Sequence, residues 1–324
     1  MPNIFYNLSL ILQSLILRTC LKIGTVINGK MIDSPKSFQV ACTVMTQIIL
    51  AVASSQYGEQ YIDVSPLGKY LRKSFEKYEN QLKEKYKDEI NNKLINELAS
   101  DRMKQELNNG VQTILAQINT LITSNGKPPY TVLLLNLKDD DLYKKENDMI
   151  SEEIIRQTNQ GIKNENGDYE KIVLPELITD EKKIHKILGH KFDQGKVSIN
   201  LMQIVKLSQK DEEKFWNILD ESLELCHEAL MYRHYALLGT SADISPIHWR
   251  YGAIARLEQG ESIDKLLKNG NSTLTLGYCG LKKAIEIFNE DNERDNVTLE
   301  KSILKYIKEK MQKWKKESGI DFIM

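Results

Sequence analysis

A long run without any charged side chain, Ser37–Gly58, constrains the fold of this chain more than any other feature. A helix that rises about 1.5 Å per residue over this length could cross a bilayer. However, the threonine, serine and glutamine side chains of the run would each need a hydrogen-bond partner in hydrocarbon. Pro35 near the first turn and Gly58 after the last turn are typical helix boundaries. We therefore predict a helix over Lys36–Gln56 that is buried in a protein core and does not span a membrane.

Charge and cysteine content limit which cellular compartment and which binding partners we expect for this chain. Lys+Arg total 44 against 45 Asp+Glu, so charge gives no reason to expect nucleic acid or an anionic membrane as the main partner. The uncharged, apolar segment Pro2–Leu17 lacks the preceding positive charge and the cleavage site of a signal peptide. The cysteines are too few and too scattered for a disulfide framework, which favours a cytoplasmic protein. They are Cys20, Cys42, Cys226 and Cys279.

Hydrophobic periodicity predicts long helices that alternate with buried strands, which is typical of an α/β protein. The almost continuous apolar run Tyr130–Leu137 suits a strand in a sheet that is covered on both faces. The segment Gly68–Leu107, rich in Lys and Glu, predicts a solvated pair of amphipathic helices. Further helices are predicted over Val111–Ile122, Ser151–Gln160, Asp211–Leu238, Leu281–Phe288 and Thr298–Lys316, and further strands over Lys171–Ile178, Lys196–Ile204 and Asn271–Tyr278.

Residue spacing alone does not identify a reaction. Glu224 and His227 stand three apart, which is the spacing of half a di-iron site, but no second Glu-x-x-His occurs. Cys226, His227 and His234 could be taken for a metal cluster, yet adjacent helical residues point about 100° apart. We therefore favour ordinary packed or exposed histidines and predict no metal ligand. No Walker loop, Gly-x-Gly-x-x-Gly, Cys-x-x-Cys or serine-elbow motif is present, so spacing leaves open whether the chain is an enzyme.

A series of ordered sequence blocks carries more information than periodicity does. In their order, the blocks resemble the catalytic part of the anaerobic (class III, oxygen-sensitive) ribonucleoside-triphosphate reductases. The resemblance runs from about Gly24 to Leu281. The blocks are Gly24–Gly29, Pro35–Phe38, Thr46–Ile48, Val52–Ser54, Tyr57-Gly58, Gly110–Thr113, Gln117–Leu121, Asn125-Gly126, Val197–Leu201, Lys214–Trp216, Leu223–His227, Gly239-Thr240, Ser245–Ile247, Tyr251–Leu257, Asp264–Leu267 and Asn269–Leu281.

The resemblance implies a fold and a division of the chain. The family fold is a ten-stranded α/β barrel of the ribonucleotide reductase and glycyl-radical type, made of two antiparallel five-stranded halves and assembled as a homodimer. We therefore expect an α/β chain with a partial barrel and added long helices. Residues 1–128 would form a mainly helical dimer and effector region, 129–290 the barrel, and 291–324 a charged C-terminal helix.

The resemblance also implies a chemistry. Family members reduce ribonucleoside triphosphates to the 2′-deoxy form under the control of deoxynucleotide effectors. A partner iron–sulfur enzyme that uses S-adenosylmethionine makes a glycyl radical near the C-terminus, which generates a thiyl radical on a finger-loop cysteine. That thiyl radical abstracts the ribose 3′-hydrogen, and formate or a dithiol protein supplies the electrons. A four-cysteine zinc site lies near the C-terminus of the family protein.

This chain departs from the family pattern where the radical chemistry takes place. No cysteine occurs between Cys42 and Cys226, and the link Thr179–His190 carries lysines where the family has its finger loop. Cys20 is no convincing match for the second family cysteine, and no glycyl-radical or zinc segment precedes Met324. We therefore expect no catalytic residue and no bound cofactor, and we interpret the chain as a truncated or decayed member of the family.

The matching blocks still indicate candidate residues for substrate binding and effector binding. The family's Phe-Asn-x-Gly becomes Phe192–Gly195, where a carboxylate at Asp193 would repel a triphosphate unless it is protonated or turned away. Backbone N–H groups at the turn after Gly277 could receive phosphate, although a tight turn that needs glycine explains it equally well. The candidates for substrate binding are Asp193, Ser272, Thr273, Gly277, Tyr278 and Gly280, and those for effector binding are Gln47 and Lys127.

Three hypotheses follow for the role of the chain. The first is a reductase fragment or paralogue that does not turn over alone. The second is a non-catalytic nucleotide-binding or regulatory partner, which pairs with a full-length reductase through the uncharged helix around Ser37–Gly58. The third is a decayed product that folds poorly because barrel strands are missing.

Overall fold

The computed structural model describes residues 12–15, 17–56, 58–87, 89–124, 126–135, 142–189, 192–289 and 296–324. Tyr57 and Asn125 of the matching blocks, the end of the predicted strand at Leu137, and His190 lie outside these ranges. The chain forms two compact units. We call Leu12–Lys191 with Ala242–Glu261 the N-terminal unit, and Phe192–Ser241 with Ser262–Met324 the C-terminal unit.

A four-stranded parallel sheet in the order β1-β4-β5-β8 forms the centre of the N-terminal unit. All of β5 is buried, as the predicted covered strand requires. The predicted strand Lys171–Ile178 shortens to β8, because Pro175 has no N–H to donate to a sheet. The strands are β1 (Leu12–Leu15), β4 (Gln60–Asp63), β5 (Thr131–Leu134) and β8 (Glu176–Ile178).

The uncharged run forms the buried helix α2 (Phe38–Ala53), as predicted. Ser37 caps its first turn, and the Glu106 carboxylate accepts the Gln39 N–H at 2.9 Å, where a helix N-terminus favours negative charge. No helix among the described residues is long and apolar enough to cross a membrane.

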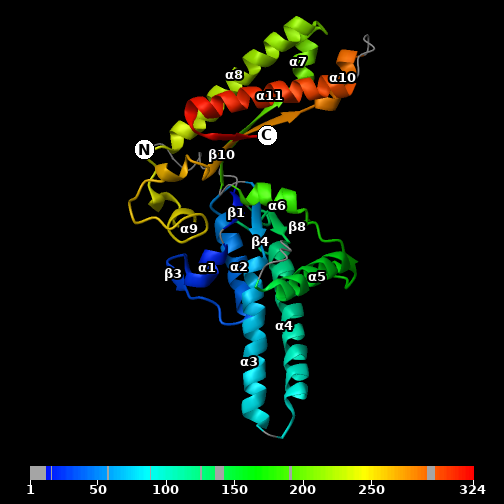
Figure 1. Ribbon diagram of the computed structural model, residues 1–324, viewed down its shortest axis with the longest axis vertical. Helices are drawn as coiled ribbons and strands as arrows, with labels where there is room; N and C mark the ends of the chain where they lie inside the picture. The colour runs from blue at the N-terminus through cyan, green and yellow to red at the C-terminus, as the bar shows by residue number, and fades with distance from the viewer. Residues whose placement is uncertain are drawn as a thin grey trace. The chain divides into compact units, whose positions relative to one another are not determined.

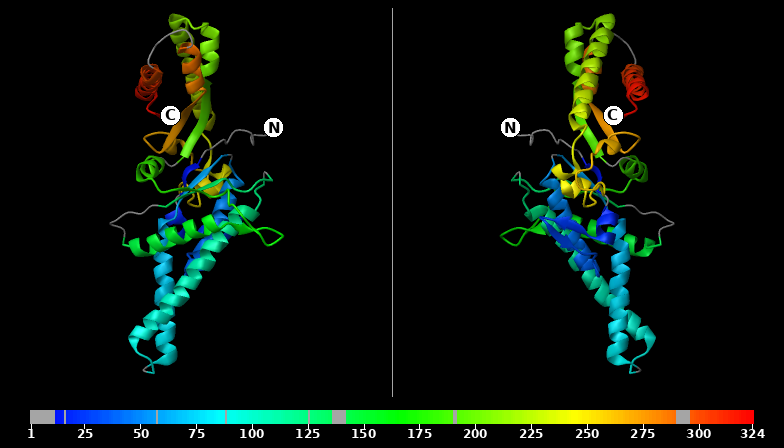
Figure 2. Two further views of the ribbon diagram at one scale, coloured as in Figure 1. Left: turned by 90° about the vertical axis from the view of Figure 1, so that its right-hand side faces the viewer. Right: turned by 90° about the vertical axis from the view of Figure 1, so that its left-hand side faces the viewer.

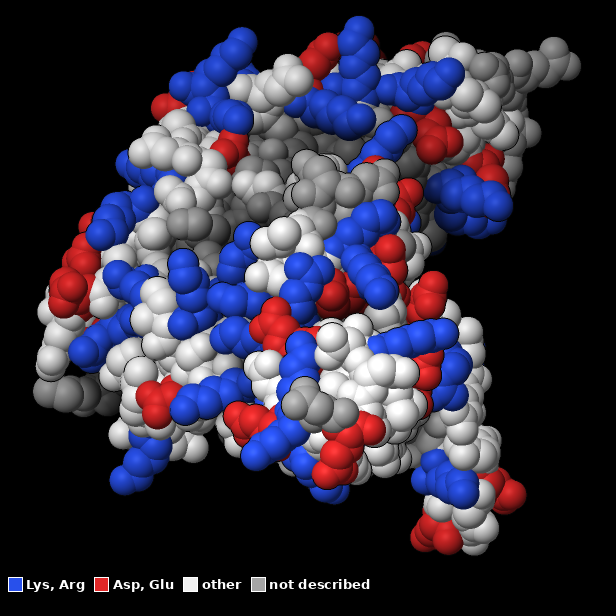
Figure 3. All heavy atoms as spheres, turned by 60° about the horizontal axis from the view of Figure 1, so that its bottom comes forward, with Lys and Arg blue, Asp and Glu red and all other residues white. Residues whose placement is uncertain are grey.

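Helices α3 (Gly68–Tyr86) and α4 (Asn92–Thr120) lie side by side as a long hairpin (Figures 1 and 2). The predicted amphipathic pair is therefore confirmed, but the separate helix expected over Val111–Ile122 is wrong, because α4 continues through Gly110 without a break. Charged side chains of both signs are interspersed on the face drawn in Figure 3.

The remaining elements of the N-terminal unit are short, except for one helix. Strands β2 and β3 form a hairpin whose Asn28-Gly29 turn has positive φ at both residues. The elements are α1 (Leu17–Ile23), β2 (Thr25–Ile27), β3 (Lys30–Ile32), α5 (Lys144–Gln160), β6 (Ile162–Lys163), β7 (Tyr169–Glu170), α6 (Glu181–Leu188) and α9 (Pro246–Trp249).

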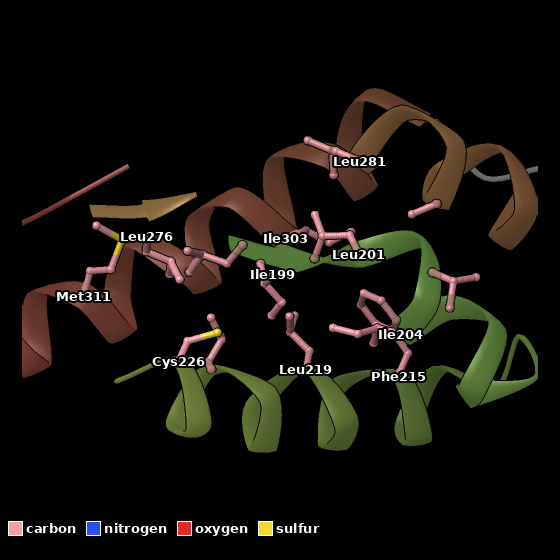
Figure 4. Close-up of a cluster of buried hydrophobic side chains, with 14 of the residues drawn as sticks. Ile199, Leu201, Ile204, Phe215, Leu219, Cys226, Leu276, Leu281, Ile303 and Met311 are labelled. Carbon is pink, nitrogen blue, oxygen red and sulfur yellow. The ribbon is translucent and has the colours of Figure 1, made fainter. Parts of the chain in front are cut away.

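A three-stranded parallel sheet in the order β11-β10-β9 forms the centre of the C-terminal unit. Figure 4 shows side chains of β9, α8 and α11 meeting in the hydrophobic cluster that covers one face of this sheet. On the other face, Lys196 and Ser198 of β9 are exposed. The elements are β9 (Phe192–Asn200), α7 (Leu201–Ser208), α8 (Glu212–Leu237), β10 (Ser272–Cys279), α10 (Leu281–Asn289), α11 (Asn296–Ser318) and β11 (Asp321–Ile323).

The predicted strand Lys196–Ile204 is wrong in its second half. Strand β9 ends at Asn200, whose side chain accepts the Gln203 N–H at 3.2 Å and so begins α7. The apolar residues Leu201 and Ile204 are therefore buried on a helix and not on a strand.

The predicted α/β class is confirmed, and the two larger sheets are parallel, but a ten-stranded barrel is not present among the described residues. The two larger sheets have four and three strands, and both are open. A barrel closes only when its two edge strands pair with each other. The boundaries of the two units do not coincide with the predicted domain boundaries at residues 128 and 290. The predicted division into an effector region, a barrel and a C-terminal helix stays a prediction about function.

Substitution of Gly110 tests the packing of α2 on α4. An added Cβ would lie 2.5 Å from Cε1 of the buried Phe38 and 3.0 Å from Sγ of Cys42. We expect Gly110→Ala to lower the free energy of unfolding by about 1 kcal/mol or more, because overpacking outweighs the gain in helix propensity of about 1 kcal/mol. Urea unfolding followed by circular dichroism measures this. The control Asn109→Ala, on the exposed face of α4, should change it by less than about 0.5 kcal/mol, and a fully stable Gly110→Ala would contradict the packing.

Candidate functional site

Three of the predicted substrate residues come together on neighbouring strands. Ser272 and Thr273 on β10 pair with Phe192 and Asp193 on β9. The Asp193, Ser272 and Thr273 side chains are at most 1% exposed. The structure therefore brings these three residues into one buried polar cluster.

The Asp193 carboxyl is buried at an irregularity in the pairing of β9 and β10. Burial raises its pKa to about 6, although the nearby Thr275 hydroxyl, the Gly195 N–H and the charges of Lys196 and Arg233 act in the opposite direction. The Gly195 N–H donates to Oδ1 at 3.1 Å. A carboxyl with a pKa of about 6 is partly protonated slightly below neutral pH, whereas an exposed aspartate is almost fully ionised there.

A buried amide network beside this cluster was missed from the sequence. Nε2 of Gln194 donates to the Leu267 carbonyl at 2.8 Å and to Oγ of Ser272 at 2.9 Å. Nδ1 of His234 donates to Oε1 of Gln194 at 2.7 Å. The Ser272 hydroxyl is therefore already engaged. The signal that could have revealed the network is a glutamine at the third position of Phe192–Gly195, where the strand is buried.

Cys226, His227 and His234, which are close in the sequence, have separate surroundings in the structure. His234 bonds to Gln194, whereas His227 stacks on Trp314 with ring centroids 4.7 Å apart. Cys226 belongs to the hydrophobic cluster of the C-terminal unit. Among the described residues, no group of three or more His, Cys, Asp or Glu side chains could hold a metal ion.

The other predicted substrate residues lie at the far end of β10. Gly277 is roughly 13 Å beyond Thr273 at the usual rise of a strand, and Tyr278 is 40% exposed. A Cβ at Gly277 would lie 2.5 Å from Oγ of Ser198, and Gly280 has a φ of +72° just before α10. The close approach of Ser198 therefore explains the glycine at 277, and the positive φ explains the glycine at 280, without a ligand. The six candidates for substrate binding divide into a buried cluster of three and three residues at the far end of β10.

The two predicted effector residues are also apart. Gln47 is exposed on α2, and Lys127 is exposed in the loop before β5. Lys127 lines a hollow of about 650 Å³ at the start of β4 and β5, and Gln47 does not. The hollow is lined by Ala53, Gln56, Gly58, Glu59, Thr123, Lys127, Pro128, Pro129 and Tyr130.

A second buried network, also missed from the sequence, reaches this hollow. His248 is fully buried, with Nδ1 2.5 Å from Oγ of Ser245 and Nε2 3.0 Å from Oε1 of Gln56. Burial lowers the pKa of His248 to about 4, so its ring is neutral at pH 7. An amide oxygen only accepts, so Nε2 of the neutral ring carries the proton and Nδ1 accepts the Ser245 hydroxyl.

Three of the four cysteines are buried, which favours the protonated thiol. Burial raises the pKa of Cys20 to about 11 and that of Cys42 well above its ordinary value, and it also raises the pKa of Cys226. Cys20 contacts the Tyr251 carbonyl at 3.7 Å. Cys279 is exposed at the end of β10.

The fold and these sites define an α/β protein with parallel, helix-covered sheets and polar groups buried on their strands. A family model described as anaerobic ribonucleoside-triphosphate reductase matches residues 12–188 and 179–324. The chain therefore belongs to this family, as the sequence blocks predicted.

Individual relatives agree with the family match. The anaerobic ribonucleoside-triphosphate reductase of Haemophilus influenzae is 27% identical over 357 residues, which cover 92% of this chain and 50% of the relative. That of Enterobacteria phage T4 is 25% identical, over 94% of this chain and 59% of the relative. The chain thus spans about half the length of the curated relatives it matches.

Solved structures show the same fold. The anaerobic ribonucleotide reductase of Thermotoga maritima, with dATP bound in its specificity site, superposes with a TM-score of 0.65 at 14% identity. The superposition covers 96% of this chain and 60% of the Thermotoga chain.

The raised pKa of Asp193 predicts a stability that falls as pH rises. The folded state holds this proton to about pH 6, whereas the unfolded chain releases it near pH 4, so the cost of the buried charge is absent below pH 4 and complete above pH 6. Asp193→Asn should therefore raise the free energy of unfolding by on the order of 2 kcal/mol at pH 7.5 and change it little at pH 4. Urea titrations at both pH values test this. Asp168→Asn, at an exposed turn, is the control, and an equal effect of Asp193→Asn at both pH values would contradict the assignment.

Proposed function

We propose that this chain binds nucleoside triphosphates as the counterpart of one half of an anaerobic ribonucleoside-triphosphate reductase, and that it does not reduce them by itself. The observation that carries the binding part of the proposal is the family match over nearly all of the described residues.

The relatives and two features of this chain support nucleotide ligands. A Thermotoga structure is described in complex with dATP and CTP. In this chain, Lys127 places a positive charge at the hollow of about 650 Å³, which Glu59 also lines with a negative one. The turn at Gly280 presents the N-terminus of α10, which is favourable for a phosphate, and the exposed Lys282 and Lys283 follow it.

The positions of the cysteines support the second half of the proposal. Thiyl chemistry needs a sulfur atom beside the ribose. Cys20, Cys42 and Cys226 are buried, and the exposed Cys279 lies at the end of an open sheet. The donor set for a zinc site does not fit either, because the described residues hold no cluster of metal-ligating side chains. The substrate would therefore be a ribonucleoside triphosphate that is bound and left unreduced.

An anaerobic activity assay tests this function directly. The purified chain, incubated with a family activating enzyme, S-adenosylmethionine, formate and radiolabelled CTP, should form no deoxynucleotide above background. The same preparation should retain labelled CTP or dATP in equilibrium dialysis. Robust dCTP formation would overturn the claim of inactivity, and absence of any nucleotide binding would overturn the proposed function as a whole.

A regulatory pairing with a full-length reductase is a second candidate, favoured by helix α2. Its exposed residues Val40 and Gln47 are seven positions apart, so they lie on one face, and neither carries a charge. Val40 is 47% exposed. An uncharged face of this kind is typical of a surface that another protein covers. The partner would be a second copy of the chain or a full-length reductase.

Substitution of Val40 tests this pairing. Val40→Glu should lower the yield of a full-length reductase co-purified with the tagged chain at least about five-fold, because a buried unpaired charge weakens an interface. Leu207→Glu, on an exposed leucine of α7 in the other unit, should leave the yield unchanged. Equal loss with both variants, or no co-purification with the unmodified chain, would remove this candidate.

A further inference from the structure

Helix α8 of the C-terminal unit has an outward face that carries large apolar side chains. Figure 4 shows Phe215, Leu219 and Cys226 pointing from α8 into the hydrophobic cluster. On another side of the same helix, Leu225 is 66% exposed and Tyr232 is 75% exposed. Large apolar side chains that lie together on a surface are typical of a site that another protein covers.

The exposed residues of this face form a continuous strip without charge. A leucine, an alanine, a tyrosine and an alanine follow one another at intervals of four, three and four positions. At about 100° per residue, these intervals keep the four side chains within about 60° of one another around the helix. We call them the α8 strip, which consists of the exposed residues Leu225, Ala229, Tyr232 and Ala236.

The alternation of large and small side chains makes the α8 strip complementary to itself. When two copies meet in opposite directions about a two-fold axis, Leu225 of one copy lies against Ala236 of the other. Tyr232 then lies against Ala229, so each large side chain fills the space over a small one, as in a close-packed interface. In a parallel pair, large side chains would meet each other, and the helix dipoles would repel.

The charged residues beside the strip stay at the rim of such a pair. Glu228 and Tyr235 lie on one flank, and a two-fold axis brings this flank against the same flank of the second copy. Tyr235, which is 60% exposed, comes level with Glu228 of that copy, so its hydroxyl can donate to the carboxylate. Glu221 on this flank extends past the end of the opposite helix. On the other flank, Arg233 lies against β9, since a Cβ at Gly195 would be 2.4 Å from its Cδ.

The area of this face is sufficient for a small stable interface. If a large side chain offers about 200 Å² when fully exposed, then Leu225, Tyr232 and Tyr235 together offer roughly 400 Å² on each copy. With the alanines, two copies would bury on the order of 1,000 Å², which is the area above which specific interfaces are found. The formal net charge of -1 leaves little repulsion between the copies.

We propose that the α8 strip is a dimer interface, in which two copies of this chain pair through antiparallel α8 helices. The interface lies in the C-terminal unit, and it is distinct from the exposed face of α2. It does not depend on nucleotide binding, so its test is separate from that of the proposed function. The two-fold axis passes close to residue 229, whereas residue 221 of the two copies would be roughly 28 Å apart along the helices.

Sedimentation velocity of the full chain tests the pairing. We expect a species of twice the 37.3 kDa chain mass that dissociates on dilution. Leu225→Glu places an unpaired charge against Ala236 of the second copy, so it should raise the dissociation constant of the dimer at least about ten-fold. Leu207→Glu, at a leucine of α7 that is 58% exposed, should leave this constant unchanged. Circular dichroism shows whether both variants are folded.

Disulfide cross-linking tests the antiparallel arrangement. The background variant Cys279→Ser removes the exposed native thiol. In this background, Ala229→Cys should form a cross-linked dimer under mild oxidation, because the axis brings residue 229 of both copies within reach of a disulfide. Glu221→Cys, exposed on the same helix, should not form one. Equal cross-linking of the two variants would contradict the antiparallel pair.

Three further outcomes would overturn the proposed interface. The first is an unmodified chain that stays monomeric at all concentrations, and the second is a dimer that Leu225→Glu does not weaken. A dimer that Val40→Glu dissociates and Leu225→Glu does not would lie on α2 instead. The third is a monomeric chain that loses a co-purified full-length reductase on Leu225→Glu, which would assign the α8 strip to that reductase.

Discussion

The burial of α2 is the constraint on which the N-terminal unit depends. Because this helix has no charged side chain, its buried faces pack without ion pairs, and Gly110 lets α4 approach Phe38 closely. Hydrogen bonds then join the C-terminal part of α2 to the start of β4 and to the loop before β5. Nε2 of Gln60 donates to the Ile49 carbonyl at 3.0 Å, and the Ser124 hydroxyl donates to the Ser54 carbonyl at 2.9 Å. The position of Gln56 thus follows from the packing of the whole helix.

In the C-terminal unit, the buried polar residues Asp193 and Gln194 lie on a strand and not at the end of a helix. One face of its sheet is covered by helices and is apolar, while Asp193 and Gln194 are buried near the start of β9. The side-chain amide of Gln194 hydrogen-bonds with Leu267, Ser272 and His234. Its hydrogen-bonding groups are therefore satisfied within the protein, and it stabilises the unit without a ligand. Asp193 differs, because its charge is costly when buried and its protonation changes near neutral pH. The two buried networks therefore differ: the one in the C-terminal unit is satisfied, whereas Nε2 of Gln56 has no hydrogen-bond partner among the described residues.

The sequence predicts the long helices well because their apolar spacing is local. Helix α8, expected over Asp211–Leu238, spans Glu212–Leu237, and strand β10 and helix α10 lie within a residue of their predicted ends. Where β9 passes into α7, the apolar run is compatible with both a strand and a helix. The side chain of Asn200 caps the first turn of α7 and so determines where the strand ends and the helix begins. The networks could not be predicted, because Gln194 and His234 are 40 residues apart in the chain, and Gln56 and His248 are 192 apart. Such contacts depend on tertiary packing, which periodicity does not contain.

Hydrogen–deuterium exchange with and without dATP is the most direct test of the central claim that this half-length chain retains a nucleotide site at the end of α2. The account predicts slower exchange of backbone amides in the segments 53–60 and 123–131 when dATP is present, with the α3–α4 hairpin tip around Tyr86 unchanged. Unchanged exchange in both segments at a saturating dATP concentration would contradict it.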